Sequence, residues 1–154
     1  MTMERAAQAE RVPRKVTLSD VYSEPHAAHT LYDLMKEREP HVNISHQALP
    51  SFETHLKFLA TRPYAAWYLI VDEMDPATTP PVNVGAIYLS KQREVGLFVF
   101  KDHQGKGYGT AALAKLIAQH PGKILANIAP GNKASQAFFK NAGFRHIQET
   151  YVLS

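Results

Sequence analysis

The segment at 104–110, Gln-Gly-Lys-Gly-Tyr-Gly-Thr, contains the residue types that most directly indicate chemistry. Its alternating glycines let successive backbone N–H groups point into one concavity without obstruction by side chains. A helix is predicted to begin there, and its free N–H groups and positive dipole end would add to an anion site. The segment therefore predicts a cradle suited to a pyrophosphate, with Lys106 as a nearby cation.

Two other phosphate-binding loops do not fit this spacing. A Walker A loop needs Ser or Thr directly after Gly-Lys, whereas Gly107 follows Lys106 here. A dinucleotide-binding loop needs G-x-G-x-x-G after the first strand of a βαβ unit, and this segment reads G-x-G-x-G after several consecutive strands. The pattern Gln/Arg-x-x-Gly-x-Gly/Ala does match. The same glycines also fit a turn that only lets a strand meet a helix, and spacing alone leaves both explanations open.

The elements that would position this loop follow from hydrophobic periodicity and from proline and glycine breaks. Apolar runs rich in β-branched and aromatic residues predict strands at 16–18, 65–71, 82–90, 93–100, 123–129 and 143–154. Apolar stripes at helical spacing predict helices at 26–39, 52–60, 110–120 and 132–141. This order of elements predicts one mixed αβ domain.

Particular residues mark the ends and faces of two of these helices. Ser51 is expected to cap the helix at 52–60, whose buried face would carry Phe52, Leu56 and Leu59. Gly143 is expected to end the helix at 132–141 as a C-terminal cap.

Length and composition fit one globular domain of 154 residues, of which 45% are hydrophobic and 20% charged. Residues 1–14 alternate charges with alanine, so we expect a flexible N-terminal tail followed by a domain over 15–154. The absence of cysteine excludes disulfides, thiolate catalysis and cysteine-based metal sites, and it fits a cytoplasmic location.

Hydropathy and charge exclude several further classes. The longest apolar run, at 64–71, is shorter than the roughly 20 residues of a membrane span. Residues 1–15 lack the apolar core of a secretory signal. A net charge of +3 without a block of like charges is compatible with an anionic cofactor and makes nucleic acid an unexpected partner.

Together with a second motif, the glycine-rich loop resembles the GNAT superfamily of N-acetyltransferases. The loop lies in EVGLFVFKDHQGKGYGTAALAKL, and ILANIAPGNKASQAFFKNAGF follows it. The second stretch matches the family's Asn-x-x-Ser…Gly-Phe pattern through Asn132, Ser135, Gly143 and Phe144. Both motifs occur in the family's order and spacing, and the resemblance covers residues 15–154.

The resemblance implies a three-layer α/β fold whose central mixed β-sheet is splayed between the fourth and fifth strands and flanked by about four helices. It implies acetyl-CoA as the acyl donor, with no metal, and direct transfer of an acetyl group to an amine in a ternary complex. The acceptor would be a primary amine of a small molecule, such as an amino sugar, or a terminal amine. The protein would be a monomer or homodimer.

The resemblance also implies which residues contact acetyl-CoA. Backbone groups of one strand would meet the pantetheine and thioester, the loop would hold the pyrophosphate, and the last helix would contact the cofactor arm. These residues are Leu97, Phe98, Val99, Gln104, Gly105, Lys106, Gly107, Tyr108, Gly109, Thr110, Asn132 and Ser135. Helix capping is a second explanation for Asn132, and the two roles can coexist.

Glu94 is the candidate general base, because an amine is mostly ammonium at neutral pH and must lose a proton. It is the only carboxylate in the strand before the loop, and alternation places it on one face with Gly96 and Phe98. The same residue also fits an exposed glutamate that pairs with Lys91 or Arg93.

Two positions depart from the family's pattern. Phe139 stands where many relatives carry a proton-donating tyrosine, and Asn127 stands where some carry a carboxylate. Tyr151 is a secondary candidate for the acid. Because of these departures, a second possible function is a module of this fold that binds acyl-CoA with weak or no catalysis. A third possible function is acyl transfer to a nucleic acid base.

The acceptor site is expected in the loop between the first two helices and on two strands. Imidazole and amide groups in that loop could recognise a sugar or assist proton transfer, and helix capping explains them equally simply. Trp67 and Tyr88 would add aromatic surface, although packing within the sheet also accounts for both. The candidate acceptor residues are His41, Asn43, His46, Trp67 and Tyr88.

Overall fold

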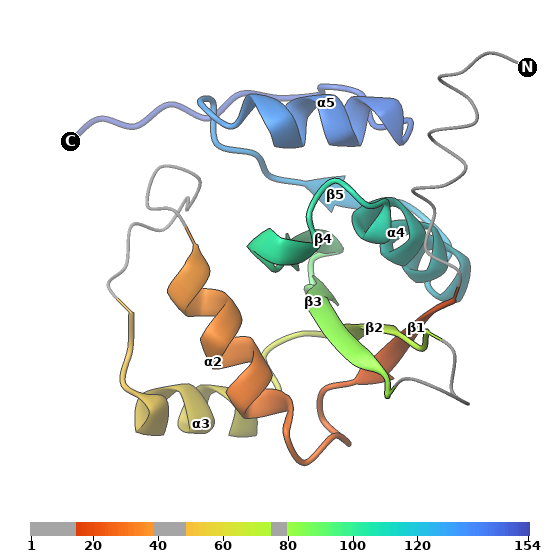
Figure 1. The fold of residues 1–154 in the computed structure, drawn as a ribbon. Coiled ribbons are helices and arrows are strands. Elements are labelled where there is room, and N and C mark those ends of the chain that lie inside the picture. The colour runs from red at the N-terminus through yellow and green to blue at the C-terminus, as the bar shows by residue number, and fades with distance from the viewer. Residues whose placement is uncertain (1–14, 39–48, 75–79) are drawn as a thin grey trace, which may run out of the picture.

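The computed structural model describes residues 15–38, 49–74 and 80–154 (Figure 1). The predicted tail at 1–14 and the candidate acceptor residues His41, Asn43 and His46 lie outside the described residues. The division into a tail and a single domain therefore stays a prediction. The described strands are β1 (Val16–Asp20), β2 (Ala66–Asp72), β3 (Val82–Leu89), β4 (Glu94–Val99) and β5 (Leu125–Ala126). The described helices are α2 (Ala27–Glu37), α3 (Phe52–Ala60), α4 (Tyr108–Gln119) and α5 (Lys133–Asn141), with a short 3-10 turn at Lys101–His103.

The sheet has the order β1-β2-β3-β4-β5, antiparallel throughout except for the parallel pair β4–β5. That parallel pair is very short, because only Glu94 with Leu125 and Val95 with Ala126 are in register. Strand β4 continues to Val99 beside β3, so β4 and β5 diverge after two residues. The predicted mixed sheet, splayed between its fourth and fifth strands, is confirmed.

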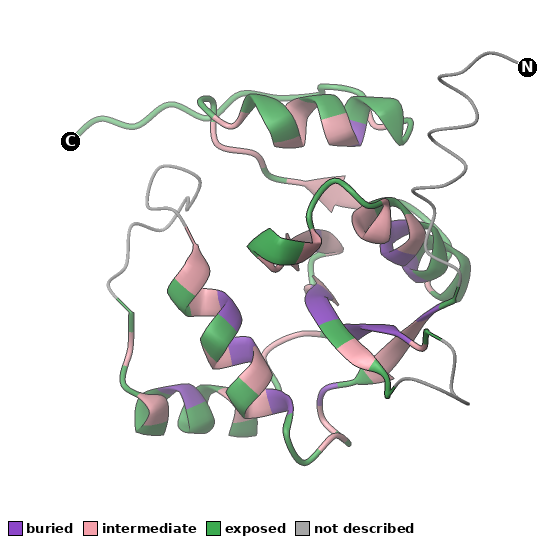
Figure 2. Cartoon of the chain, viewed as in Figure 1, coloured by how far each residue is buried: buried purple, intermediate pink, exposed green. Residues whose placement is uncertain are grey.

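Helices cover both faces of the sheet (Figure 1), and each face has its own apolar core. On one face α2 packs through Ala27, Leu31 and Leu34, and α3 packs against α2. On the other face α4 packs through Ala112, Leu113 and Leu116, with Phe139 of α5. Figure 2 shows these buried positions on the sides of α2 and α4 that face the sheet. The three-layer architecture follows from strands that are apolar on both faces. No helix among the described residues is long and apolar enough to cross a membrane.

The start of α3 follows the prediction, and its buried face follows it except at Leu56. Ser51 Oγ accepts a hydrogen bond from the Thr54 N–H at 3.1 Å, as expected of an N-cap. Leu56 is 44% exposed, whereas His55 is only 2% exposed. Phe52 and Leu59 are half-buried on the packed side of α3 as expected, so the error is confined to Leu56, whose place is taken by the imidazole of His55.

The predicted strand at 143–154 is wrong. Residues 145–154 have no assigned secondary structure, and no backbone hydrogen bond joins them to another described part of the chain. Strand-like composition is not sufficient here, because a strand exists only where an edge pairs with it. The helix end before this segment is as predicted: Gly143 has φ +99°, which is the left-handed conformation of a C-terminal cap.

Candidate functional site

The divergence of β4 from β5 opens one edge of β4 to ligands. Phe100 N–H donates to Val84 O, and Ser90 N–H donates to Glu94 O, so even-numbered residues of β4 direct their backbone groups toward β3. Odd-numbered residues therefore direct theirs toward β5, as the hydrogen bond from Leu125 N–H to Arg93 O confirms. Beyond the two paired residues, the backbone groups of Leu97 and the N–H of Val99 consequently face the opening. Those of Phe98 face β3.

The glycine-rich loop follows directly on this open edge. Gly105 and Gly107 have φ of +75° and +87°, and Gly107 is the N-cap of α4. The first hydrogen bond of the helix runs from Ala111 N–H to Gly107 O, so the preceding N–H groups have no acceptor within the helix. Gln104 Nε2 donates to Val99 O at 3.0 Å and ties the loop to the end of β4. Lys106 is exposed. The loop therefore places two left-handed glycines directly before the free N–H groups of a helix start, and anion binding there stays a prediction.

Tyr108 anchors this helix start to the sheet. Its hydroxyl donates to Asp72 Oδ2 at 2.5 Å, at the end of β2. Burial, together with the hydrogen bond to Asp72, raises the pKa of Tyr108 to about 12. The side chain of Tyr108 therefore points into the protein, and only its backbone is available to the loop. Asp72 is a buried carboxylate that sequence reasoning missed, because its only signal was a charge at a strand end.

Asn132 caps the start of α5, which is the second of the two roles expected for it. Its Oδ1 accepts a hydrogen bond from the Ser135 N–H at 3.1 Å. Phe139 is buried at 9% exposure and packs edge-to-face on Phe138 and Phe144. The position where relatives often carry a tyrosine is therefore part of the apolar core here.

Glu94 lies at the closed end of the divergence. Asn127 Nδ2, just after β5, donates to Glu94 Oε2, so these two side chains bridge the strands where they begin to separate. The alternative pairing with Arg93 does not occur. The Arg93 guanidinium instead donates to the carbonyl oxygens of Lys123, His120 and Pro121 at 2.9–3.0 Å. It fixes the connection from α4 to β5 against the start of β4.

An aromatic surface lies on the α2 face of the sheet, where Tyr88 pairs with Gly96, two residues along β4 from Glu94. A Cβ at Gly96 would lie 2.2 Å from the ring of Tyr88, so the lack of a side chain lets that ring lie against β4. Tyr64 stacks on Tyr88 with ring centroids 3.8 Å apart, and burial raises the pKa of Tyr64. Trp67 packs behind Tyr64 and is only 7% exposed. We call Tyr64, Tyr88 and Trp67 the aromatic wall, of which sequence reasoning missed Tyr64.

Tyr151 lies in the exposed segment at 145–154, where its hydroxyl donates to Glu149 at 2.6 Å. Among the described residues no contact joins it to Glu94 or to the glycine-rich loop. The structure therefore does not bring the candidate acid and the candidate base together.

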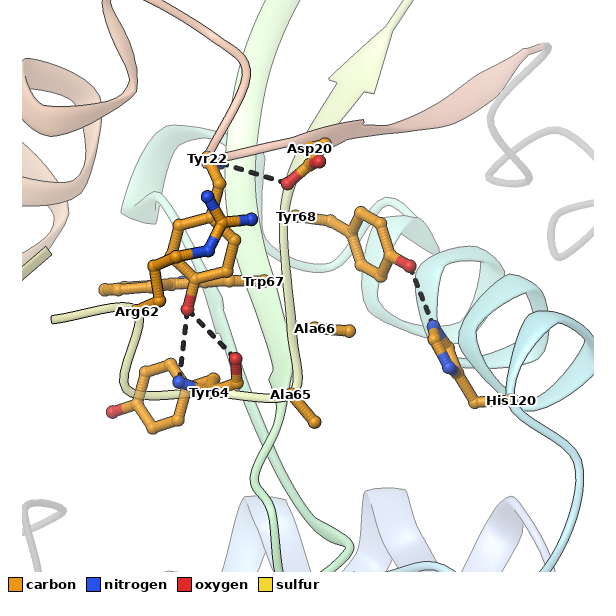
Figure 3. Close-up of a pocket in the computed structure, with 9 residues that line it drawn as sticks. All are labelled: Asp20, Tyr22, Arg62, Tyr64, Ala65, Ala66, Trp67, Tyr68 and His120. Carbon is orange, nitrogen blue, oxygen red and sulfur yellow. Dashed lines mark hydrogen bonds between the residues drawn. The ribbon is translucent and has the colours of Figure 1, made fainter. Parts of the chain in front are cut away.

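A pocket of about 280 Å³ lies at the start of β2 and shares Tyr64 and Trp67 with the aromatic wall (Figure 3). Its lining includes Arg62, Tyr64 and Trp67, and the hydroxyl of Tyr68 is 2.7 Å from His120 Nε2 at its far side. No residue of β4, β5 or the glycine-rich loop lines it. Within the described part of the chain, no group of three His, Asp or Glu side chains is placed to hold a metal ion.

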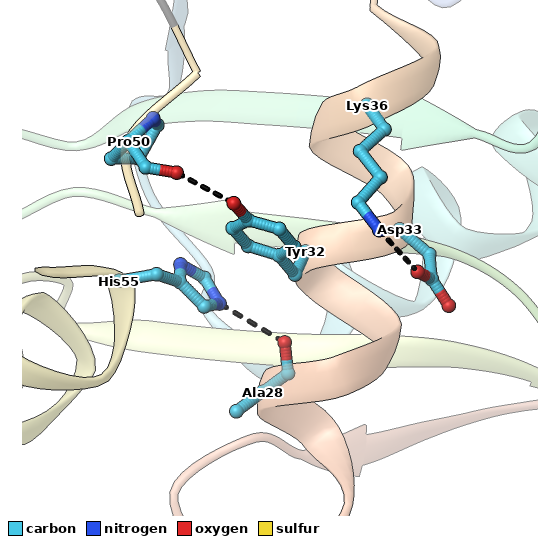
Figure 4. A network of polar contacts seen from close by, with 6 residues as sticks. All are labelled: Ala28, Tyr32, Asp33, Lys36, Pro50 and His55. Atoms are coloured by element: carbon cyan, nitrogen blue, oxygen red, sulfur yellow. Dashed lines mark hydrogen bonds and ion pairs between the residues drawn. The ribbon is translucent and has the colours of Figure 1, made fainter. Parts of the chain in front are cut away.

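His55 is the second buried polar residue that sequence reasoning missed (Figure 4). Its Nε2 is 3.1 Å from Ala28 O of α2, and its ring packs against Tyr32 and Phe52. The Tyr32 hydroxyl donates to Pro50 O at 2.7 Å. Burial lowers the pKa of His55, and the hydrogen bond to Ala28 partly offsets this effect. This network joins α2 to α3 and to the chain entering α3.

The fold and site together define a mixed αβ protein whose sheet opens between two parallel strands beside a glycine-capped helix. The chain belongs to the acetyltransferase (GNAT) family, whose model matches residues 28–144. A comparison with curated protein sequences gives no match.

Solved structures share this fold at low sequence identity. A domain from Methanocaldococcus jannaschii DSM 2661 is similar with a TM-score of 0.71 and 16% identity, covering 88% of this chain and 92% of that one. A variant of spermidine N-acetyltransferase SpeG from Vibrio cholerae is similar with a TM-score of 0.64 and 15% identity, covering 86% of this chain and 81% of that one. Ribosomal-protein-alanine N-acetyltransferase from Brucella melitensis is similar with a TM-score of 0.59 and 20% identity, covering 87% of this chain and 86% of that one. At these identities the likeness establishes the fold.

Proposed function

We propose that this protein is an N-acetyltransferase that uses acetyl-CoA to acetylate a primary amine of a small molecule or a terminal amine. The observation that carries the proposal is the divergence of β4 from β5 after two residues, directly beside a helix start capped by Gly107. This arrangement combines an open strand edge with an anion cradle, as a long ligand with a pyrophosphate at one end requires. Membership of the acetyltransferase family supports the same function.

The residues of the loop fit the pyrophosphate of acetyl-CoA. Gly105 and Gly107 hold left-handed backbone conformations and present no Cβ atom at these two positions of the loop. The first N–H groups of α4 supply donors and the positive end of the helix dipole. Lys106 is exposed beside them and would add a cation. The pantetheine arm would then run along the open edge of β4 toward Glu94.

The chemistry that acetyl-CoA supplies is a thioester whose acetyl group moves to the amine nitrogen while CoA thiolate leaves. Leu97 directs its backbone N–H into the opening, where it would stabilise negative charge on the acetyl oxygen. Glu94 would accept the proton that the amine loses. Asn127 holds the carboxylate of Glu94 by a hydrogen bond and thereby fixes its position between the two strands.

The aromatic wall would receive the acceptor. Tyr88 and Tyr64 stack on each other, and Tyr88 pairs with Gly96, two residues along β4 from Glu94. Aromatic faces attract an ammonium group before it is deprotonated. Trp67 supports this surface from behind, since it is almost fully buried. The candidate loop residues His41, Asn43 and His46 stay a prediction for the remaining side of the acceptor site.

The experiment has two parts. Calorimetry with acetyl-CoA tests binding, and release of CoA thiol in the presence of an amine panel tests transfer. The panel contains an amino sugar, an amino acid, a polyamine and a peptide with a free N-terminus. Binding together with amine-dependent thiol release supports the proposal. Absence of acetyl-CoA binding by the folded protein would refute it.

A module that binds acyl-CoA without efficient transfer is the second candidate. It is favoured by the burial of Phe139 in the core, because α5 then has no hydroxyl at the position that often protonates the leaving thiolate. Tight binding without thiol release above the rate of hydrolysis, for every amine of the panel, would favour this second function.

A further inference from the structure

Arg38 follows the last residue of α2 and lies on the same face of the sheet as the aromatic wall. Its backbone N–H donates to Met35 O at 3.3 Å, and its own backbone is extended, so the helix ends there. The guanidinium lies over the ring of Phe98 of β4, with Cζ 4.2 Å from the ring centroid. Arg38 is half-buried. The end of α2 and the ring of Phe98 therefore hold its guanidinium against the sheet.

The residues of β4 that face α2 form a row with Arg38 at one end. Glu94, Gly96 and Phe98 share this face by strand alternation, and Phe98 packs against the core on the α2 side. The ring of Tyr88 lies against Gly96, in the middle of the row. Glu94 and Phe98 are four residues apart, so their positions on the strand are separated by about 13 Å. The proposed base and the Arg38 guanidinium therefore lie at opposite ends of the row.

The guanidinium adds a fixed positive charge to the proposed acceptor site. Burial lowers the pKa of Arg38, and the nearby Tyr88 and Tyr64 partly offset this effect. A guanidinium nevertheless keeps its charge at neutral pH. Glu37, the neighbouring carboxylate on α2, accepts a hydrogen bond from the Lys101 N–H at 2.8 Å. A ligand on the aromatic wall therefore meets a positive charge beside the two tyrosines.

We propose that Arg38 selects acceptors that carry an anionic group, a carboxylate or a phosphate, in the same molecule as the amine. A guanidinium can bind either group through two parallel hydrogen bonds, whereas the ammonium groups of a polyamine would meet a like charge. Leu97, whose N–H would receive the acetyl oxygen, directly precedes Phe98. The amine and the anionic group would therefore lie close together on β4. This inference rests on the proposed function and adds the class of acceptor to it.

Matched acceptors with and without the anion test the inference. β-Alanine is paired with its amide for a carboxylate, glucosamine 6-phosphate is paired with glucosamine for a phosphate, and spermidine represents the polyamines. Calorimetry measures their binding to the full chain saturated with CoA, so the result does not depend on turnover. At least one anionic acceptor is expected to bind about tenfold or more tightly than its neutral partner, because hydrogen bonds to charged groups are strong. The pair that shows the preference distinguishes carboxylate from phosphate. Spermidine should bind more weakly than that acceptor.

Substitutions at Arg38 assign the preference to its charge. Arg38→Gln is expected to abolish the preference, and Arg38→Lys to retain part of it, since lysine keeps the charge without the planar fork. Arg145→Gln, the control, removes a charge from the exposed C-terminal segment and should leave the preference unchanged. Unchanged binding of the neutral partner to Arg38→Gln would show that the site is intact.

The outcomes separate this inference from the proposed function. Failure to bind CoA or acetyl-CoA would refute the proposed function, and the same titrations of the free protein would still test Arg38. Acetyl transfer to amines without any anionic preference would overturn the inference and leave the proposed function standing. Tighter binding of spermidine than of every anionic acceptor, a preference that survives Arg38→Gln, or an equal loss of both members of a pair in that variant would also overturn it.

Discussion

Glu94 and Asn127 are joined by a hydrogen bond at the point where β4 and β5 begin to separate. The carboxylate belongs to the first residue of β4 and the amide to the first residue after β5, and their hydrogen bond spans the closed end of the opening. An asparagine in this place cannot act as a base itself, but it can orient the carboxylate that does. The chemistry proposed for this site therefore depends on Glu94.

Replacing Glu94 with Gln tests the proposed base. The substitution keeps the shape and removes the proton acceptor, so the rate at neutral pH should fall by roughly 10²–10⁴. Raising the pH should restore part of the rate, because more of the amine is then already neutral. The KM for acetyl-CoA should hardly change. Glu53→Gln, on the surface of α3, is the matched control. An unaltered rate and pH profile would assign Glu94 a purely structural role.

Gly107→Glu tests the anion cradle. Any side chain there must adopt the left-handed conformation, at a cost of about 1–2 kcal/mol, and a carboxylate would repel phosphate. Calorimetry should show acetyl-CoA affinity reduced by about 100-fold or more, or about 2.7 kcal/mol. Gly143→Glu introduces the same strain and charge at φ +99°, with no atom within 4 Å of its Cβ. Equal losses in both variants would contradict the assignment of the loop.

At the scale of elements, Arg93 joins the start of β4 to the connection between α4 and β5. Its guanidinium donates three hydrogen bonds to backbone carbonyls. Arg93→Ala should lower the free energy of unfolding by about 1–3 kcal/mol, because these carbonyls lose a charged donor. Urea denaturation measures this loss. Arg145→Ala, in the exposed C-terminal segment, should change stability little, and a similar loss in both variants would exclude a specific role for Arg93.

The contact between α2 and α3 should be sensitive to acid. Burial lowers the pKa of His55 below its ordinary value of 6.5, so the unfolded chain binds a proton at higher pH than the folded chain does. Stability should therefore fall as the pH drops below about 6.5. Thermal unfolding at pH 7.5 and 5.5 should show a larger decrease for the natural chain than for His55→Gln. His146→Gln, at an exposed position, should behave like the natural chain.

Elements determined by local signals were predictable from the sequence, and those determined by distant partners were not. Ser51 caps α3 and Gly143 ends α5, as predicted, because capping depends on a few neighbouring residues. The parallel, diverging strands were expected only because the sequence resembles the family. The burial of His55 could not be predicted, since it depends on how α3 meets α2. The segment at 145–154 has strand composition, but composition does not specify whether an edge is available.

At the scale of the whole molecule, the two-residue ladder between β4 and β5 makes the domain a body of two unequal parts. The larger part comprises β1–β4 with α2, α3 and α4, and the smaller part comprises β5 and α5. The larger part has long antiparallel ladders. The smaller part is held by this short ladder, the hydrogen bond from Asn127 to Glu94, Arg93 and the packing of Phe139. Local opening should therefore begin in the smaller part.

A ligand bound between β4 and β5 would contact both parts and would stabilise their association across the short ladder. At a concentration 100 times its Kd, acetyl-CoA would stabilise the closed form by about 2.7 kcal/mol. Hydrogen–deuterium exchange should then slow by about 100-fold for the amides of 127–129 and α5, and hardly at all for β1 and α2. Uniform slowing across the chain would show that both parts open together. The shortest ladder of the sheet would thus make the substrate itself a structural component of the domain.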